Sequence, residues 1–230
     1  MYTGPNTITK GLVLSLDAAN TKSYPGSGTT WRDLSGNNNT ATMFGAVPFL
    51  TDVSQCFDFA TATGAAASSS TLGFTFASNM ISTTGNFTLS TWIKNPNTSV
   101  GQVGLFSNAG GGDGYRFGIG TNGIYYLIGP TYTEGSLSFS STLSPLLWYN
   151  VSAVFNRSGT SILLYLNGVF QSSVTIPSQS AMQNGAPGIV RSACCSIYTG
   201  KLSSFMAYNA VLSQSEILQN YEATKARFGL

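Results

Sequence analysis

The order of apolar and polar residues along the chain predicts an all-β protein. Short segments in which apolar and polar residues alternate are separated by turn residues at roughly 8–12-residue intervals. Leu12, Leu14 and Leu16 share one face of the first predicted strand. The clearest strand pair is predicted at 148–155 and 161–166. This pattern is typical of a two-sheet antiparallel β-sandwich.

Turn signals predict further hairpins. A glycine-rich tip at 110–114 divides the middle of the chain, and Asn167-Gly168 predicts a two-residue type I′ turn. Asparagine and glycine favour that turn because both adopt the positive φ angles it requires. The meander strands are predicted at 101–106, 115–119, 123–128 and 137–139.

The end of the chain has a helical pattern. Ser213 and Glu216 have the spacing of a capping box, in which each side chain accepts a hydrogen bond from the other residue's exposed amide. Ile217 and Tyr221 follow on one stripe. We therefore expect one short C-terminal helix, about residues 213–226, that packs on the sandwich near the start of the chain.

The composition narrows the range of functions. Charged residues make up 8% of the chain, against about 25% in ordinary soluble proteins. The formal net charge is +2, and no cluster of lysine and arginine is present to neutralise successive phosphates, so nucleic acid is not an expected partner. No apolar run approaches the roughly 20 residues of a membrane span, and no secretory signal pattern is seen. We expect a single domain, residues 1–230, synthesised in a cytoplasm.

The three tryptophans and the three cysteines bear on the predicted core. Trp31, Trp92 and Trp148 each lie between apolar neighbours, so we expect all three to be shielded. Three cysteines do not form an even disulfide framework, and adjacent cysteines on a strand point to opposite faces. We expect free thiols, although Cys56 paired with Cys194 or Cys195 stays open.

The chain lacks the groups that most hydrolases use. It contains no histidine, which removes Ser-His-Asp and Cys-His systems and most zinc sites. Glycanases need two carboxylates at a defined separation, and the glutamates are only Glu134, Glu216 and Glu222, the last two on the predicted helix. We therefore expect neither an enzyme nor a cofactor.

Calcium is the metal that the sequence leaves open. It binds six to eight oxygens, usually with carboxylates among them, and Asp113 in the glycine-rich tip is the candidate ligand. The alternative is that Asp113 only accommodates the backbone of a glycine loop. Asp17 and Asp33 are expected to accept hydrogen bonds from turn amides and to hold the first loop over the core.

Two segments carry a family resemblance. Residues 11–43 read GLVLSLDAANTKSYPGSGTTWRDLSGNNNTATM, and residues 200–217 read GKLSSFMAYNAVLSQSEI. They resemble the laminin-G-like jelly rolls of the concanavalin A-like lectin and glucanase superfamily, in the version common in structural proteins of tailed, especially marine, bacteriophages. The resemblance implies that Trp92 packs inside the sandwich. Where relatives carry an acidic turn, this chain has ATATGAAASSS at 60–70, which weakens any metal site there.

These observations lead to a functional prediction. The resemblance implies a non-enzymatic virion structural protein on the virion surface: a capsid decoration, head-fibre or tail-appendage module. Its expected partners are capsid or appendage proteins and further copies of itself, as a homo-oligomer or multicopy array. The alternative is a lectin-like module that binds a host glycan. The candidate ligand or interface residues are Tyr125, Tyr126, Tyr132, Asn37, Asn38 and Asn39.

Overall fold

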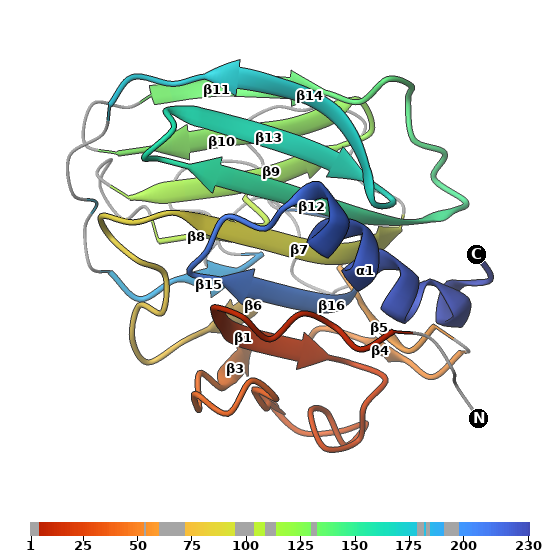
Figure 1. Cartoon of the computed structure of the whole chain (residues 1–230). Coiled ribbons are helices and arrows are strands. Elements are labelled where there is room, and N and C mark those ends of the chain that lie inside the picture. Colours follow the sequence, from red (N-terminus) through yellow and green to blue (C-terminus); the bar gives the residue numbers. More distant parts are fainter. Residues whose placement is uncertain are drawn as a thin grey trace.

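The computed structural model of the chain contains two β-sheets packed face to face, with one helix on the outside of one of them (Figure 1). It describes residues 5–52, 54–59, 72–94, 104–108, 114–129, 133–178, 182, 185–190 and 198–230. All strand pairs in these residues are antiparallel. The predicted all-β, two-sheet jelly roll with a short C-terminal helix is confirmed.

The first sheet, called sheet A, has eight strands in the described part of the chain. Their path is β14 (Val169–Thr175), β13 (Ser161–Leu166), β12 (Trp148–Asn156), β7 (Phe87–Lys94), β16 (Lys201–Tyr208), β5 (Cys56–Asp58) and β4 (Phe49–Leu50). Strand β1 (Leu12–Asp17) also pairs with β16, beyond the short contact of β16 with β5. The first and last strands of the chain are therefore neighbours in one sheet.

The second sheet, sheet B, likewise has eight strands among the described residues. Their order is β11 (Thr133–Ser138), β10 (Gly123–Ile128), β9 (Tyr115–Gly120), β8 (Phe106–Ser107), β15 (Gly188–Ile189), β6 (Gly73–Thr75), β3 (Ala41–Phe44) and β2 (Thr30–Trp31). Strand β11 begins and ends earlier than the predicted 137–139. The predicted turn at Asn167-Gly168 is confirmed by φ angles of 50° and 79°.

The main core lies between the sheets and is rich in aromatic rings. Trp31 from sheet B meets Phe57 from sheet A with ring centroids 4.8 Å apart, and Phe74 at 5.0 Å. Tyr24 lies 4.8 Å from Phe57 on another side. Edge-to-face contacts of this kind add stability beyond the burial of area. The first loop, which carries Tyr24 and Trp31, is thereby anchored in the core.

A β-bulge turns the start of the first strand to the other face of the sheet. The prediction that Leu12, Leu14 and Leu16 share one face is therefore wrong for Leu12. The register of β1 against β16 shifts between Leu12 and Leu14, and an extra residue in one strand reverses the facing of what precedes it. Leu14 and Leu16 point into the main core, as predicted. Leu12 instead packs on the outer face of sheet A, beside Ile217 of the helix.

The C-terminal helix begins with the predicted cap. Ser213 Oγ accepts a hydrogen bond from Glu216 N at 3.3 Å, and Glu216 Oε2 accepts one from Ser213 N at 2.7 Å. Helix α1 spans Gln214–Thr224 and continues as a 3₁₀ helix, η1, over Lys225–Phe228. The helical segment thus runs two residues beyond the predicted end.

The helix covers the outer face of sheet A, together with the start of the chain. Asn220 Oδ1 accepts a hydrogen bond from Ile8 N at 2.8 Å, which confirms the expected contact with the N-terminal segment. Trp92 is fully buried, but it lies under the helix and not between the sheets, contrary to the family expectation. Its ring stacks on Phe228 at 4.0 Å, and its Nε1 donates to Thr224 Oγ1 at 2.8 Å.

The other shielded side chains agree with the sequence. Trp31 is fully buried and Trp148 is 9% exposed, so the expected shielding of all three tryptophans is confirmed. Cys56 is a buried free thiol beside Trp92. Burial raises the pKa of Cys56 to about 11, so the thiol is protonated at neutral pH. Cys194 and Cys195 lie outside the described residues.

Candidate functional site

The asparagines proposed as ligand residues lie in a loop that closes the free edge of β1. Asn37 Nδ2 donates to Leu12 O at 3.0 Å, and Asn39 Nδ2 donates to Val13 O at 2.7 Å. Asn38, between them, has a φ of 58°. Two of the three amides therefore satisfy the backbone of an edge strand, which blocks its pairing with another chain.

Asp33 organises the same loop. Its carboxylate accepts hydrogen bonds from Ser15 N at 2.9 Å, Ser35 N at 2.8 Å and Asn39 N at 3.0 Å. Asp17 Oδ1 accepts from Ala19 N at 2.9 Å in the preceding turn. The expectation that both aspartates accept hydrogen bonds from turn amides is confirmed.

The proposed tyrosines on β10 are less exposed than expected. Tyr126 points into the main core and is 4% exposed. Tyr125, on the opposite face of β10, is 7% exposed, and its hydroxyl donates to Glu134 Oε2 at 2.5 Å. Burial, followed by the hydrogen bond and the charge of Glu134, raises the pKa of Tyr125 to about 12. Both tyrosines are therefore buried.

A polar row crosses the outer face of sheet B. Successive strand registers align one residue from each strand: Thr30, Thr42, Thr75, Gly188, Ser107, Arg116, Leu127 and Glu134. Thr42 and Glu134, toward the two ends, are exposed, whereas the four central positions from Gly188 to Leu127 are buried. This face carries hydroxyl and charged groups where sheet A carries tryptophan.

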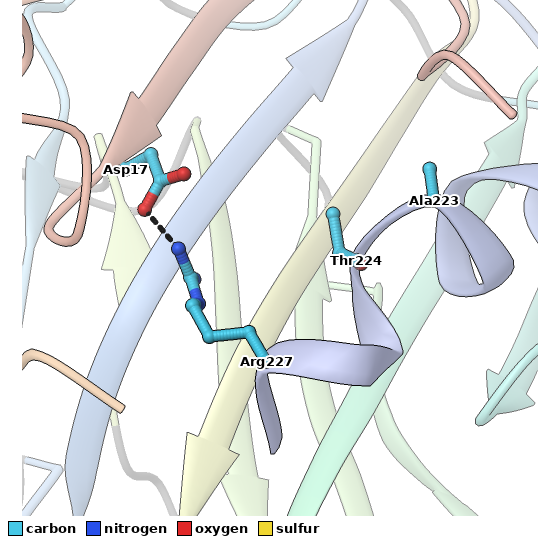
Figure 2. Close-up of a pocket in the computed structure, with 4 residues that line it drawn as sticks. All are labelled: Asp17, Ala223, Thr224 and Arg227. Atoms are coloured by element: carbon cyan, nitrogen blue, oxygen red, sulfur yellow. Dashed lines mark hydrogen bonds and ion pairs between the residues drawn. The ribbon is translucent and has the colours of Figure 1, made fainter. Parts of the chain in front are cut away.

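A pocket of about 210 Å³ lies at the edge of the helix cover, where β1 ends beside α1 and η1. It is lined by Asp17, Ala223, Thr224 and Arg227. Figure 2 shows Asp17 and Arg227 joined on one side of the pocket, with Thr224 and Ala223 on the other. Two segments that are 210 positions apart in sequence therefore build one site.

The polar side of the pocket combines a carboxylate with a guanidinium group. Arg227 Nη1 donates to Asp17 Oδ1 at 2.5 Å, and Nη2 donates to Ser203 Oγ at 3.1 Å. The two side chains remain 22% (Arg227) and 32% (Asp17) exposed. Asp17 Oδ2 makes no hydrogen bond with a described residue, and Arg227 Nε is buried without a partner. The pair thus retains an open acceptor.

The other side of the pocket is apolar. Thr224 Oγ1 accepts from Trp92 Nε1 and donates to Asn220 O at 2.9 Å, so its hydroxyl is already used within the protein. The Thr224 methyl group and the Ala223 side chain are left to line the pocket. A ligand here would meet hydrogen-bonding groups on one side and methyl groups on the other, the arrangement that orients small polar ligands.

Asp113, the candidate calcium ligand, and Tyr132 lie outside the described residues. Within the described ranges, no three His, Cys, Asp or Glu side chains are grouped to hold a metal ion. Among the helices the structure describes, none is long and apolar enough to cross a lipid bilayer.

Sequence reasoning assigned Asp17 to its turn and did not find Arg227. The spacing between the two residues gives no signal, because their contact depends on the pairing of β1 with β16 and on the path of the C-terminal helix. An arginine just after an amphipathic helix is otherwise a common surface residue. Only the arrangement in space reveals the pair.

The antiparallel two-sheet sandwich with one short helix matches the concanavalin A-like jelly-roll fold. A family profile described as the concanavalin A-like lectin/glucanases superfamily, of the laminin-G type, matches residues 67–218. The match covers more than half of the 230 residues, and the chain belongs to this superfamily. A search of curated proteins finds no match to the sequence.

Solved structures share the fold at low identity. Domain 4 of AbnA, a GH43 extracellular arabinanase from Geobacillus stearothermophilus solved with arabinotriose, superposes with a TM-score of 0.67 and 13% identity over 91% of this chain and 98% of that one. The binding domain of botulinum neurotoxin DC, solved with rat synaptotagmin II, gives a TM-score of 0.66 and 14% identity over 94% and 52%.

A third structure concerns botulinum neurotoxin type C, whose cell entry is dependent upon interaction with two ganglioside molecules. It gives a TM-score of 0.68 and 16% identity over 93% of this chain and 51% of that one. The chain therefore spans about half the length of the toxin binding domains it matches. At these identities the likeness shows a shared fold.

Proposed function

We propose that the chain is a non-catalytic carbohydrate-binding module and that the pocket at Asp17 and Arg227 holds one sugar unit. The observation that carries the proposal is the open oxygen of Asp17 beside the guanidinium group of Arg227, facing an apolar wall. Two structurally similar proteins support it, since one was solved with arabinotriose and another depends on gangliosides.

The chemistry of the pocket suits a sugar ring. A carboxylate oxygen accepts hydrogen bonds from ring hydroxyls, and a guanidinium group donates to hydroxyl oxygens. The methyl groups of Ala223 and Thr224 can contact the C–H groups of the ring. At about 210 Å³, the pocket is smaller than the roughly 300–1,000 Å³ of drug-sized sites, which favours a single ring or a chain end.

The same residues argue against hydrolysis. Glycoside hydrolysis ordinarily requires two carboxyl groups that flank the bond to be cleaved, about 5–10 Å apart. Asp17 is the one carboxylate among the described residues that line the pocket. Its position in an ion pair, with no second acid facing it there, fits binding without catalysis.

Calorimetric titration tests the function and the site separately. The purified chain would be titrated with arabinotriose and with ganglioside oligosaccharides, after a screen against a glycan panel. Asp17→Asn keeps an oxygen for Ala19 N but removes the charge, and we expect the Kd to rise about tenfold, the loss of one charge-assisted hydrogen bond. Glu222→Gln is the matched control, because it removes the carboxylate of another partly exposed ion pair, that of Glu222 with Lys225, which does not line the pocket.

Each outcome of that experiment has a clear meaning. If no carbohydrate binds the wild-type chain with a Kd below roughly 1 mM, an affinity of about 4 kcal/mol, the proposed function fails. If a carbohydrate binds but Asp17→Asn leaves its Kd unchanged, the function stands and the site is elsewhere.

A second candidate function is attachment to a virus particle through protein contacts. Its support is the resemblance of the segments 11–43 and 200–217 to tailed-phage proteins, together with a surface that has few charges. Contacts between neutral surfaces should survive high salt, because screening weakens only charged contacts. Virions washed in about 1 M salt and analysed by mass spectrometry should retain the chain at a fixed copy number, and its absence would exclude this role.

A further inference from the structure

An exposed apolar patch lies where the β13–β14 turn meets the helix. Val169 is 58% exposed, Phe170 44% and Leu218 41%. The turn packs on α1, since Gln214 Nε2 donates to Gly168 O at 2.7 Å (Figure 1). These three residues are called the hairpin–helix patch.

Two more exposed leucines lie at the same end of sheet A. Leu146 is 76% exposed and Leu147 54%, and they immediately precede β12. The start of β12 contacts the turn directly, because Asn167 N donates to Asn150 O at 2.8 Å and Asn150 N to Asn167 Oδ1 at 2.9 Å. Five of the eight large exposed apolar side chains in the described residues thus gather at this end, which is unusual for a surface with scattered apolar groups.

The five side chains themselves are uncharged, and β7 places Lys94 opposite Trp148, beside Leu147. Between residues 135 and 178 the only charged residue is Arg157, which is 7% exposed and donates to Thr83 O at the opposite end of β12. On the helix, Leu218 is followed four residues later by Glu222, whose charge is balanced by Lys225 at 2.7 Å.

We propose that the hairpin–helix patch, extended by Leu146 and Leu147, is the interface through which two copies of this chain associate around a two-fold axis. In such an interface each residue faces the same surface of the other copy, so any net charge near the axis repels itself. The five uncharged side chains meet that requirement, whereas a different partner would gain specificity from complementary charges. Burial of the apolar side chains supplies the attraction.

The contact is made by side chains and not by pairing of strands. Strand β14 is at the edge of sheet A, but Gln171 Nε2 donates to Val169 O at 3.2 Å and to Phe170 O at 3.3 Å. These bonds occupy backbone acceptors that an added strand would need. The interface therefore joins the faces of two modules and leaves their sheets separate.

The proposed sugar pocket lies toward the other end of the helical segment. Leu218 and Arg227 are nine residues apart, which corresponds to about 14 Å along a helix. Two pockets on one dimer would bind a multivalent surface more tightly than one pocket does. The interface does not depend on the sugar proposal, since self-association can be measured without any glycan.

Sedimentation equilibrium tests the interface. The 24.2 kDa chain should dimerise with a micromolar Kd, and Phe170→Lys should raise that Kd roughly 100-fold by placing like charges across the axis. Leu34→Lys is the matched control, since Leu34 is 38% exposed in the loop at the β1 edge, and it should leave the Kd unchanged. Leu146→Lys, in an exposed loop, serves as a second variant if Phe170→Lys does not fold.

A mixing experiment distinguishes a two-fold contact from other associations. Phe170→Lys and Phe170→Glu chains should each be monomeric, and the mixture should recover the dimer because opposite charges then meet. A wild-type chain that stays monomeric at all concentrations would overturn the proposal, even if lipid vesicles or another protein cover the patch. A dimer that Phe170→Lys and Leu146→Lys leave intact would overturn it as well.

Discussion

On the outer face of sheet A, Trp92 and Trp148 lie beneath Phe228 and helix α1, whereas the outer face of sheet B carries a row of threonine, serine and charged residues. Both sheets bury one face in the same core, so the difference lies in what each strand places on its second face. An apolar second face has to be covered by other parts of the chain. On sheet B, Thr42 and Glu134 toward the ends of the row can contact water directly, and the four central positions are buried.

The C-terminal helical segment that covers sheet A also lines the pocket. Its rim is the place where β1, α1 and η1 meet, and the ion pair between Asp17 and Arg227 joins the sheet to the cover. A partly exposed pair of this kind contributes only about 0–1 kcal/mol. Its significance is positional, because it fixes two polar groups at the rim of an otherwise apolar cover.

The largest expected effect on stability comes from removing the Trp92 ring, on which the C-terminal helical segment packs. Trp92→Ala should lower the free energy of unfolding by about 3–5 kcal/mol, because it leaves a cavity and removes the hydrogen bond from Trp92 Nε1 to the Thr224 hydroxyl. Thr42→Val, at an exposed position on the outer face of sheet B, should change it by no more than about 0.5 kcal/mol. Urea denaturation measures both, and equal effects would contradict the contrast between the faces.

The helix cap should have an intermediate effect. Ser213→Ala removes the acceptor for Glu216 N and should lower the free energy of unfolding by about 1 kcal/mol. Ser173→Ala, at an exposed position on β14, is the control and should be close to neutral. A cap variant as stable as this control would mean that the cover is held by its apolar contacts alone.

Tyr125, on strand β10 of sheet B, should affect the stability of the protein at high pH. Its folded-state pKa of about 12 is above the ordinary value of 10.0, so the folded state holds the proton more tightly. The stability that this proton provides is present below pH 10 and is lost as the pH rises toward 12. Between pH 10 and 12, Tyr125→Phe should therefore lose less stability than the wild-type chain. Chemical denaturation at each pH measures the difference. A parallel pH dependence of the two proteins would argue against the bond to Glu134.

The smallest expected effect is the change in stability at acidic pH that comes from Glu216 in the helix cap. The Ser213 amide holds the pKa of Glu216 below its ordinary value of 4.5. A lowered folded-state pKa stabilises the protein above the ordinary value, and that stability is lost as the pH falls through the lower value. Because the group is largely exposed, Glu216→Gln should reduce stability at pH 7 by only a few tenths of a kcal/mol. The difference should vanish near pH 3, as the Glu216 carboxylate becomes protonated.

Local features of the fold could be predicted because they depend on neighbouring residues. The capping box at Ser213 and Glu216 and the turn at Asn167-Gly168 follow from backbone geometry over a few positions. The facing of Leu12 could not be predicted, because the bulge that turns it outward is set by hydrogen bonds to β16 near the other end of the chain. Alternation gives the period of a strand but not the place where its register shifts.

The candidate site could not be predicted from the sequence for the same reason, because contacts between distant parts of the chain bring its residues together. Trp92 was expected to be buried, and it is, but the helix that covers it begins more than 120 residues later. Asp17 was interpreted from its turn alone, and nothing near Arg227 in the sequence indicates a partner. Asn37 and Asn39 resembled ligand groups because free amides are common in binding sites, but β1 needed them to satisfy its open edge.

The contact between the two ends of the described chain has a mechanical consequence. Asn6 and Ile8 are held against Gln219 and Asn220 by hydrogen bonds of 2.7 and 2.8 Å. Tension applied through the two ends would load these bonds first and peel the helix from sheet A before the sandwich opens. Peeling separates Arg227 from Asp17, so a ligand in that pocket would be released by force. Force spectroscopy with handles at both ends should show a small first extension, lost in a variant with α1 deleted.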